Sequence, residues 1–174
     1  MPLHRLPPFV GGKAFRVVVE SPRGSTAKLK FDPAIDAMTL SRPLTYGLRY
    51  PFDWGFVPGT QAADGDPLDA MLAWDTETFP GVVIPCRALG IVRVDQKSVR
   101  TGRRERNDRV VAMPLEAPRF DQLRKAGDLS ARLRREIETF FVAVTALEGK
   151  DIRILGWGGP EAALRLIRRS AIGD

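Results

Sequence analysis

The sequence predicts one α+β domain built on a small β-barrel, with two helices in its C-terminal half. The N-terminal part of the chain contains many short β-branched or alternating runs that are separated by turn residues. After Asp128 the apolar residues recur every three or four positions instead, which indicates helix. With 174 residues, 44% of them hydrophobic, the chain is long enough for one core and too short for two comfortable domains.

Each strand is predicted from β-branched or alternating residues bounded by Gly, Pro, Asp or Ser. The predicted strands cover residues 15–20, 27–31, 38–42, 68–74, 82–84, 88–94, 110–113 and 152–155. The segment 51–59, which is punctuated by Pro and Gly, is assigned no strand, and Pro85-Cys86-Arg87 separates two of the strands. Residues 1–13 hold three prolines and no long apolar run, so we expect an extended tail there.

Two helices are predicted after the strands. The first is expected to begin with Asp128 as its N-cap and to run for about five turns. Its apolar stripe consists of Leu133, Ile137, Phe140, Phe141, Val144 and Leu147. The second follows Gly158-Gly159 and has Pro160 at its first position, where the missing N–H of proline is not needed. Its buried face is expected to consist of Ala163, Leu164, Ile167 and Ala171.

Composition excludes several classes of protein. The apolar fraction is too high for a disordered chain. No apolar run of about 18 residues is present, and the N-terminus has no signal-peptide pattern, so we expect a soluble cytoplasmic protein without a membrane partner. The single cysteine, Cys86, excludes an internal disulfide and a cysteine-based metal site. With a single histidine, His4, in the expected tail, any metal is expected to be held by oxygen atoms.

The charges are segregated along the chain. A formal charge of +6 and a pI near 10.0 are compatible with nucleic acid, phosphate ligands or an anionic surface, and do not choose among them. Residues 50–86, however, contain six acidic residues and no Lys or Arg. This pattern suggests an acidic pocket for cations beside bases that hold an anion. On charge alone, a solvated acidic loop is an equal alternative.

The chemistry concentrates in Asp64-Gly65-Asp66-Pro67-Leu68-Asp69. Three carboxylates within six residues repel one another unless cations lie between them. Gly65 permits a tight turn, and Pro67 keeps Asp66 out of helical conformation. Oxygen ligands alone favour Mg²⁺, Mn²⁺ or Ca²⁺, and the spacing differs from that of a calcium-binding helix–loop–helix. The alternative is an Asp-Gly hairpin turn with additional surface acids.

The segment Asp64–Ala70 resembles the Asp-x-Asp-Pro-hydrophobic-Asp signature of the family I soluble inorganic pyrophosphatases. The resemblance extends in order over nearly the whole chain. It includes Val17–Glu20, Tyr50-Pro51, Gly55-Phe56, Pro80-Gly81, Cys86-Arg87, Val110–Pro114, Phe140-Phe141, Leu147-Glu148 and Gly156-Trp157. It implies a single domain over residues 1–174, namely a small five-stranded OB-like β-barrel with two helices packed outside.

The resemblance implies a metal site built from carboxylates, with Mg²⁺ as the expected cofactor and Mn²⁺ as the alternative. The expected ligands are Asp64, Asp69, Asp95, Asp108 and Glu20. The match of Asp95 requires a gap of one position, because the family has its metal aspartate one residue later. Asp108 is taken in place of Asn107, which aligns with a further metal aspartate.

The resemblance also assigns catalytic and substrate-binding residues. Asp66 matches the residue that accepts a proton from the attacking water, and Lys28 and Arg42 assist catalysis. The expected substrate-binding residues are Lys28, Arg42, Tyr50, Trp54 and Arg109. Several positions depart from the family. Lys30 replaces a glutamate, Trp54 a tyrosine and Arg109 a lysine, whereas Val144 and Thr145 replace a Tyr-Lys pair that binds phosphate.

The activity implied by the resemblance is Mg²⁺-dependent hydrolysis of inorganic pyrophosphate to two phosphates by a metal-activated water. The departures leave an alternative: a weakened barrel that acts on another phosphoanhydride or binds nucleic acid or protein through its basic segment 97–109. Surfaces that bind single strands usually carry aromatic residues among the bases, and this segment has none. We therefore expect a solvated hairpin at 97–109, no nucleic-acid partner, and a homo-oligomer that is a hexamer if it follows bacterial relatives.

Overall fold

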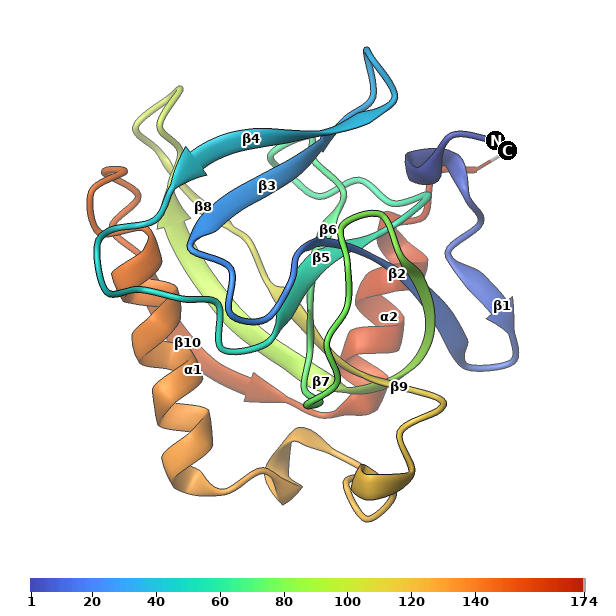
Figure 1. Ribbon diagram of the computed structural model, residues 1–174. Coiled ribbons are helices and arrows are strands. Elements are labelled where there is room, and N and C mark those ends of the chain that lie inside the picture. The colour runs from blue at the N-terminus through green and yellow to red at the C-terminus, as the bar shows by residue number, and fades with distance from the viewer. Residues whose placement is uncertain (174) are drawn as a thin grey trace.

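Five strands close into a barrel in the computed structural model, which describes residues 1–173 (Figure 1). They are β2 (Ala14–Ser21), β5 (Asp53–Val57), β6 (Leu68–Leu72), β9 (Arg109–Pro114) and β7 (Val83–Lys97). The barrel closes because the long strand β7 pairs with β9 along one part of its length and with β2 along another. Neighbouring barrel strands are antiparallel except for β6 and β9, which are parallel. The predicted five-stranded α+β barrel is confirmed.

The remaining elements surround the barrel. Strands β1 (Phe9–Gly11), β8 (Arg104–Arg106) and β10 (Arg153–Gly158) extend its sheet, and β3 (Ala27–Asp32) pairs with β4 (Ala37–Pro43) as a separate hairpin. Single 3-10 turns lie at Leu3–Arg5, Pro118–Phe120 and Ala126–Asp128. The helices are α1 (Ala131–Val144) and α2 (Pro160–Ser170). In Figure 1 the β3–β4 hairpin arches over one side of the barrel, and α1 and α2 lie on other sides of it.

The barrel strands are buried on both of their faces, and each helix covers one apolar cluster. Along β6 and β9, alternate side chains enter two different clusters: Ala70 and Val110 join the cluster that α2 covers, whereas Met71 and Val111 join the cluster that α1 covers. Ala163, Leu164 and Ile167 of α2 complete the first cluster, as predicted, whereas Ala171, also predicted to be buried, lies just beyond the helix and is exposed. Burial on both faces explains why β9 reads as a continuous apolar run and not as an alternating one.

The sequence analysis predicted no strand in the segment 51–59, which was wrong, because this segment contains β5. All five of its residues are buried between β2 and β6. Gly55, which was interpreted as turn punctuation, is required by close packing: a Cβ at this position would lie 1.8 Å from the carbonyl oxygen of Val18. A glycine inside a strand often marks such an approach of two backbones. The close contact brings the inner end of β2, with Glu20, next to β5.

The predicted break at Pro85 was also wrong, because β7 runs without interruption from Val83 to Lys97. The carbonyl of Pro85 accepts a hydrogen bond from the amide of Leu115, just beyond the end of β9. The nitrogen of Pro85 therefore lies just beyond the last residue pair of β7 and β9, which is Cys86 and Pro114. Its missing N–H costs no ladder bond there, which is the situation in which strands tolerate proline.

Helix α1 is shorter than the sequence predicted. Its N-cap is Ser130, whose side chain accepts a hydrogen bond from the amide of Leu133 at 3.1 Å. The carboxylate of Asp128, the predicted cap, accepts from the amides of Arg124 and Lys125 and closes a 3-10 turn instead. The helix ends at Val144, so Leu147 is not part of its stripe and is 85% exposed. Helix α2 begins at Pro160, as predicted, with Gly159 as its N-cap.

Residues 1–13 do not form an extended tail, contrary to expectation. Strand β1 pairs with β2, and the guanidinium of Arg16 donates to the carbonyls of Pro7 and Phe9. The ring of His4 lies 5.6 Å from that of Phe31, and its carbonyl accepts a hydrogen bond from the amide of Gly59. The N-terminal segment is therefore docked on the barrel beside the β3–β4 hairpin.

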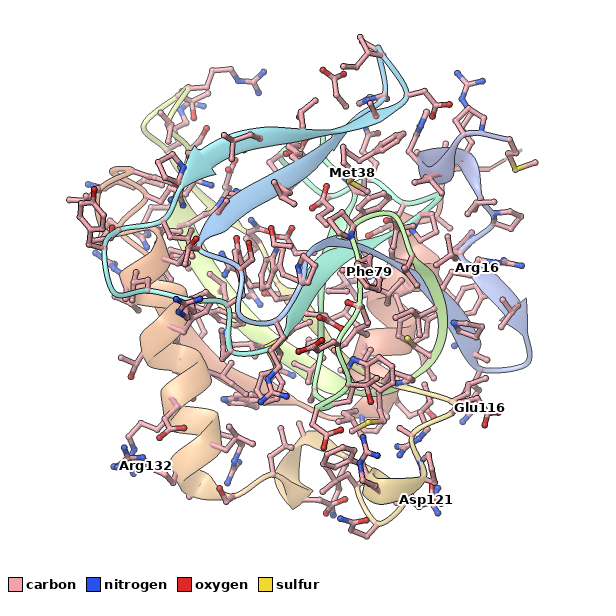
Figure 2. The ribbon with its side chains drawn as sticks, viewed as in Figure 1. Arg16, Met38, Phe79, Glu116, Asp121 and Arg132 are labelled. Carbon is pink, nitrogen blue, oxygen red and sulfur yellow. The ribbon has the colours of Figure 1, made fainter. Side chains whose placement is uncertain are left out.

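Some side chains on the β3–β4 hairpin pack into the molecule, whereas those on the outer face of α1 are exposed to solvent. Figure 2 shows Met38 on the β3–β4 hairpin, where it packs with Val18, Phe31 and Phe56. Arg132, by contrast, points away from α1 on the outer side of the molecule. Within residues 1–173, none of the helices has the length and apolar character needed to cross a membrane.

Candidate active site

A cavity of about 540 Å³ lies between the β3–β4 hairpin, β5 and the segment that precedes β6. Next to it is a small recess of about 40 Å³, which reaches the C-terminal end of α1. The two hollows share Lys28, Trp54, Asp69, Asn107 and Lys150, so they form one continuous site. We refer to the carboxylate-bearing wall made by Asp64, Asp66 and Asp69 as the acidic rim, and to the small hollow as the basic recess.

The acidic rim is shaped by a local turn. Gly65, with φ of +89°, reverses the chain, and the side chain of Asp64 accepts a hydrogen bond from the amide of Asp66 at 3.1 Å. Leu68 anchors the start of β6 in the core, so Asp69 projects from the opposite face of that strand. Partial burial raises the pKa of Asp64, and the charges of Asp69 and Asp66 raise this pKa further. The three predicted carboxylates are thus brought together.

Glu20 contributes a fourth carboxylate to the cavity from the end of β2. Its side chain is buried and accepts a hydrogen bond from the amide of Phe31 at 2.8 Å, which ties β2 to the β3–β4 hairpin. Burial raises the pKa of Glu20 to about 7, and the charge of Asp69 acts in the same direction. Glu20, one of the predicted metal ligands, lines the cavity.

Lys30 compensates part of the negative charge of the rim. Its ammonium donates to the carboxylate of Asp66 at 2.7 Å. Burial lowers the pKa of Lys30, but the hydrogen bond with Asp66 and the charge of that residue outweigh burial, and the net shift is upward. The charge reversal noted in the sequence therefore places a cation directly on the acidic rim.

The basic recess collects cationic side chains from segments that are far apart in the sequence. The predicted residues Lys28, Arg42, Tyr50, Trp54 and Arg109 all line it. Arg42 forms an ion pair with Glu148 and donates to the carbonyl of Val144 at 2.7 Å. Burial raises the pKa of Tyr50 to about 12, so this residue offers an uncharged hydroxyl at neutral pH.

Arg109 is the most deeply buried of these cations, at 4% exposed. Its guanidinium lies over the rings of Trp54 and Phe141, 5.1 Å and 4.6 Å from their centroids. Burial lowers the pKa of Arg109, and its Nε has no hydrogen-bond partner among the described residues. The tryptophan that replaces a tyrosine thus supplies a stacking surface for the arginine that replaces a lysine.

Asp95 and Asp108, two of the predicted metal ligands, are not brought to the site. The carboxylate of Asp95 is paired with Arg104, and that of Asp108 is 2.8 Å from Arg106 and accepts from the amide of Val94. Neither residue lines the cavity or the recess. The physical reason is strand alternation, since inward-facing Val92 and Val94 place residue 96 inward and residue 95 outward.

Two amides occupy the inner positions instead. Gln96 is 2% exposed, and its Oε1 has no hydrogen-bond partner within residues 1–173. It lines a neighbouring hollow together with Asp64 and Asp66, whereas Asn107, also buried, lines the cavity and the recess beside Asp69. The sequence analysis missed Gln96, although extending the alternation of Val92 and Val94 by one step would have found it.

The site fits an oxygen-liganded divalent cation. No three His, Cys, Asp or Glu side chains in the described part of the chain converge closely enough to hold a metal by themselves. The unpartnered oxygen of Gln96 is a further hard donor in the hollow that Asp64 also lines, and the amide of Asn107 is another in the cavity that Asp64 and Asp69 line. Carboxylate and amide oxygens are the donors that Mg²⁺ and Mn²⁺ accept.

The basic segment 97–109 forms the predicted hairpin, in which β7 and β8 pair through Lys97 and Arg104. Arg104 and Arg106 are engaged by Asp95, Asp151 and Asp108. Of the bases in this segment, Arg109 alone lines the basic recess. Arg109 itself lies beyond the β7–β8 hairpin, as the first residue of β9.

An acidic rim and a basic recess that adjoin in one continuous site on a five-stranded barrel are the arrangement expected of a metal-dependent hydrolase of phosphate compounds. Residues 17–172 match the family model for inorganic pyrophosphatase. The chain is 35% identical to the inorganic pyrophosphatase of Synechocystis over 96% of this chain and 95% of that protein, and 37% identical to that of Geobacillus stearothermophilus over 89% and 90%. It is also similar to the crystal structure of the Thermus thermophilus inorganic pyrophosphatase, with a TM-score of 0.89 and 32% identity over 98% of this chain and 97% of the other.

The chain therefore belongs to the inorganic pyrophosphatase family. Membership implies a divalent metal cofactor, and it agrees with the resemblance that the signature Asp64–Asp69 predicted.

Proposed function

We propose that the chain hydrolyses inorganic pyrophosphate to two phosphates, with Mg²⁺ as its cofactor or Mn²⁺ as a substitute. The observation that carries this proposal is the continuity of the site: Lys28, Asp69 and Asn107 line both the cavity with the acidic rim and the basic recess. A phosphoanhydride needs both halves at once, because its oxygens carry the charge that the bases neutralise and its hydrolysis requires an activated water.

The metal-binding residues in this proposal are Asp64 and Asp69, with the amide oxygens of Gln96 and Asn107. A divalent cation bound there would lower the pKa of a coordinated water and polarise phosphoryl oxygens. The unpartnered Oε1 of Gln96 supports this assignment, because buried polar atoms normally have a partner. Glu20 places a further carboxyl group behind these donors, at the inner end of the same wall.

Asp66 serves as the group that orients the attacking water and accepts its proton. Its carboxylate is exposed to the cavity and is held in place by the ammonium of Lys30 at 2.7 Å. Rigid placement matters for this role, since a general base has to lie within hydrogen-bonding distance of the proton that it removes. Lys30 is therefore a positioning residue for Asp66.

In this proposal the phosphoryl groups are bound in the recess by Lys28, Arg42, Tyr50 and Arg109, and the ring of Trp54 stacks against Arg109. The unpartnered Nε of Arg109 lies in a desolvated environment, where a charge-assisted bond to phosphate is stronger than in water. These residues stabilise the charge on the transferred and departing phosphates, which is the main requirement of phosphoryl transfer.

A phosphate-release assay tests the proposal. Pyrophosphate, a nucleoside triphosphate and tripolyphosphate should each be supplied with Mg²⁺, with Mn²⁺ and with a chelator. We expect release from pyrophosphate in the presence of either metal and none with the chelator. Faster release from tripolyphosphate or the nucleotide than from pyrophosphate would assign the site to another phosphoanhydride.

Two further expectations belong to the same proposal. The chain is expected to act in the cytoplasm, and to form a homo-oligomer that is a hexamer if it follows bacterial relatives. Sedimentation of the metal-bound protein measures the second directly, and a monomeric mass would contradict it.

A further inference from the structure

Lys150 lies at the junction of the two halves of the site, although the sequence analysis gave it no role. It belongs to the connection between α1 and β10, and its side chain lines both the cavity and the basic recess. Its carbonyl accepts a hydrogen bond from the amide of Lys97 at 2.6 Å, which fixes the connection to the end of β7. The side chain is 25% exposed, so the ammonium is directed along a wall of the site and is not free in solvent.

Glu148 holds this ammonium together with a second cation of the recess. One oxygen of Glu148 lies 3.7 Å from Nζ of Lys150, and the other pairs with Arg42. Glu148 is itself positioned by the turn that ends α1, where its amide donates to the carbonyl of Thr145 at 2.9 Å. Within residues 1–173, Glu148 is the one carboxylate within 4.0 Å of the Lys150 ammonium.

Positive charge exceeds negative charge among the side chains that line the recess. Four cationic side chains line it, contributed by Lys28, Arg42, Arg109 and Lys150. Among the described residues, Asp69 is the one carboxylate that lines the recess, and Glu148, Asp64 and Glu20 act on these cations from outside it. Burial lowers the pKa of Lys28, and the charges of Lys150 and Arg42 oppose its protonation as well. Glu148 pairs with Arg42 and Lys150, whereas Lys28 and Arg109 have no ion-pair partner within residues 1–173. A bound anion would relieve both the repulsion among these cations and the unpartnered Nε of Arg109.

The residues at the end of α1 supply no positive charge to the recess. Thr145 lines the recess, but its hydroxyl is directed to the carbonyls of Phe141 and Val142 at 3.1 Å and 3.3 Å. Its neighbour Val144 is apolar and packs in the core. Of the cations in the recess, Lys150 is therefore the one that the stretch from α1 to β10 contributes.

We propose that Lys150 is a substrate-binding residue, whose ammonium binds a phosphoryl group of the pyrophosphate held between the acidic rim and the basic recess. This inference rests on the proposed function. It predicts that the positive charge of Lys150 contributes to substrate affinity. It also predicts that a lysine introduced at another position on the same recess can restore part of that affinity.

The test uses the full-length protein with Lys150→Met, and Lys13→Met as a matched control at an exposed lysine that is paired with Glu161. A charge-assisted bond is worth about 1.5–3 kcal/mol, so Lys150→Met should lower kcat/KM for pyrophosphate by about 10- to 150-fold. It should also weaken binding of imidodiphosphate, a non-hydrolysable analogue, by at least about 10-fold in calorimetry. Lys13→Met should change neither quantity.

A second variant separates substrate binding from a merely structural role. Thr145→Lys, added to Lys150→Met, places an ammonium on the other side of the same recess and should restore part of the lost analogue affinity. Lys150→Arg should retain most of it.

The proposal is overturned if Lys150→Met keeps the wild-type kcat/KM and analogue affinity, or if its loss of affinity is not reduced by Thr145→Lys. Should the wild-type protein fail to hydrolyse pyrophosphate, the proposed function fails, and the calorimetric measurements alone then decide the role of Lys150.

Discussion

The acidic rim and the basic recess are built in opposite ways. The carboxylates of the rim come from one short segment, and Asp64 and Asp66 are exposed on a turn that their own backbone stabilises. The cations of the recess come from three distant segments, which are the β3–β4 hairpin, β9 and the connection between α1 and β10, and Arg109 is buried between aromatic rings. The rim is thus specified locally and the recess by the tertiary fold. Substitutions in the rim should change ligand binding with little effect on folding, whereas substitutions in the recess should change both.

The largest effect is expected at the point where the two regions meet. Asp69 lines both hollows, so Asp69→Asn should lower pyrophosphate hydrolysis by about 100-fold or more, because losing even an indirect metal contact costs about 10- to 100-fold. The variant should also lose most of the stabilisation that Mg²⁺ gives to the folded protein. Thermal unfolding with increasing Mg²⁺ measures this. Asp75→Asn, at an exposed carboxylate paired with Arg119, is the control, and equal shifts in the two variants would contradict the metal assignment.

Arg109→Met probes the buried side of the comparison. Loss of its charge should lower kcat/KM by about 10- to 150-fold. At the same time, replacing a buried group that lacks a hydrogen-bond partner with an apolar side chain should raise the free energy of unfolding by about 1–3 kcal/mol. Steady-state kinetics and urea denaturation on the same preparation measure the expected fall in kcat/KM and the expected rise in the free energy of unfolding. A variant that is both inactive and less stable would show that Arg109 serves the fold rather than the substrate.

Glu20 allows a test through pH. Its pKa is raised from 4.5 to about 7 in the folded protein, so between these values the folded state holds a proton that the unfolded state has lost. In metal-free protein the free energy of unfolding should therefore fall by about 2–3 kcal/mol as the pH rises from 4.5 to above 7. Glu20→Gln should remove this contribution and become the more stable protein at pH 8. Parallel stability–pH curves for the two proteins would argue against a buried, protonated Glu20.

The smallest effect is expected from restoring charge to the rim. Gln96→Asp converts the unpartnered amide oxygen into a carboxylate beside Asp64 and Asp66. We expect Mg²⁺ affinity to rise by about 10-fold, which corresponds to about 1.4 kcal/mol. Isothermal titration with Mg²⁺ measures it, and Asp95→Asn serves as the comparison because that carboxylate is paired with Arg104. Weaker Mg²⁺ binding by Asp95→Asn than by the wild type would place Asp95 in the metal site after all.

The same contrast explains how far sequence reasoning reached. The rim was predicted because its turn is encoded by consecutive residues, with Gly65 and Pro67 fixing the backbone between the acids. Strand β5 was missed because Gly55 is required by its close contact with the backbone of Val18, which is remote in sequence. Asp95 was chosen over Gln96 because charge was given more weight than strand alternation. Lys150 was missed because its role depends on Glu148 and Arg42, which only the fold brings to it.

The docked N-terminus has a practical consequence for the architecture of the chain. The carbonyl of His4 accepts a hydrogen bond from the amide of Gly59, and the amide of Ile172 donates to the carbonyl of the same glycine. His4 and Ile172 both line the cavity, so a purification tag on either end would extend from the mouth of the site. The segments near the two ends of the chain therefore lie close together. Joining them through a short linker and opening the chain at the tip of the β7–β8 hairpin would give a circular permutant with every barrel strand intact.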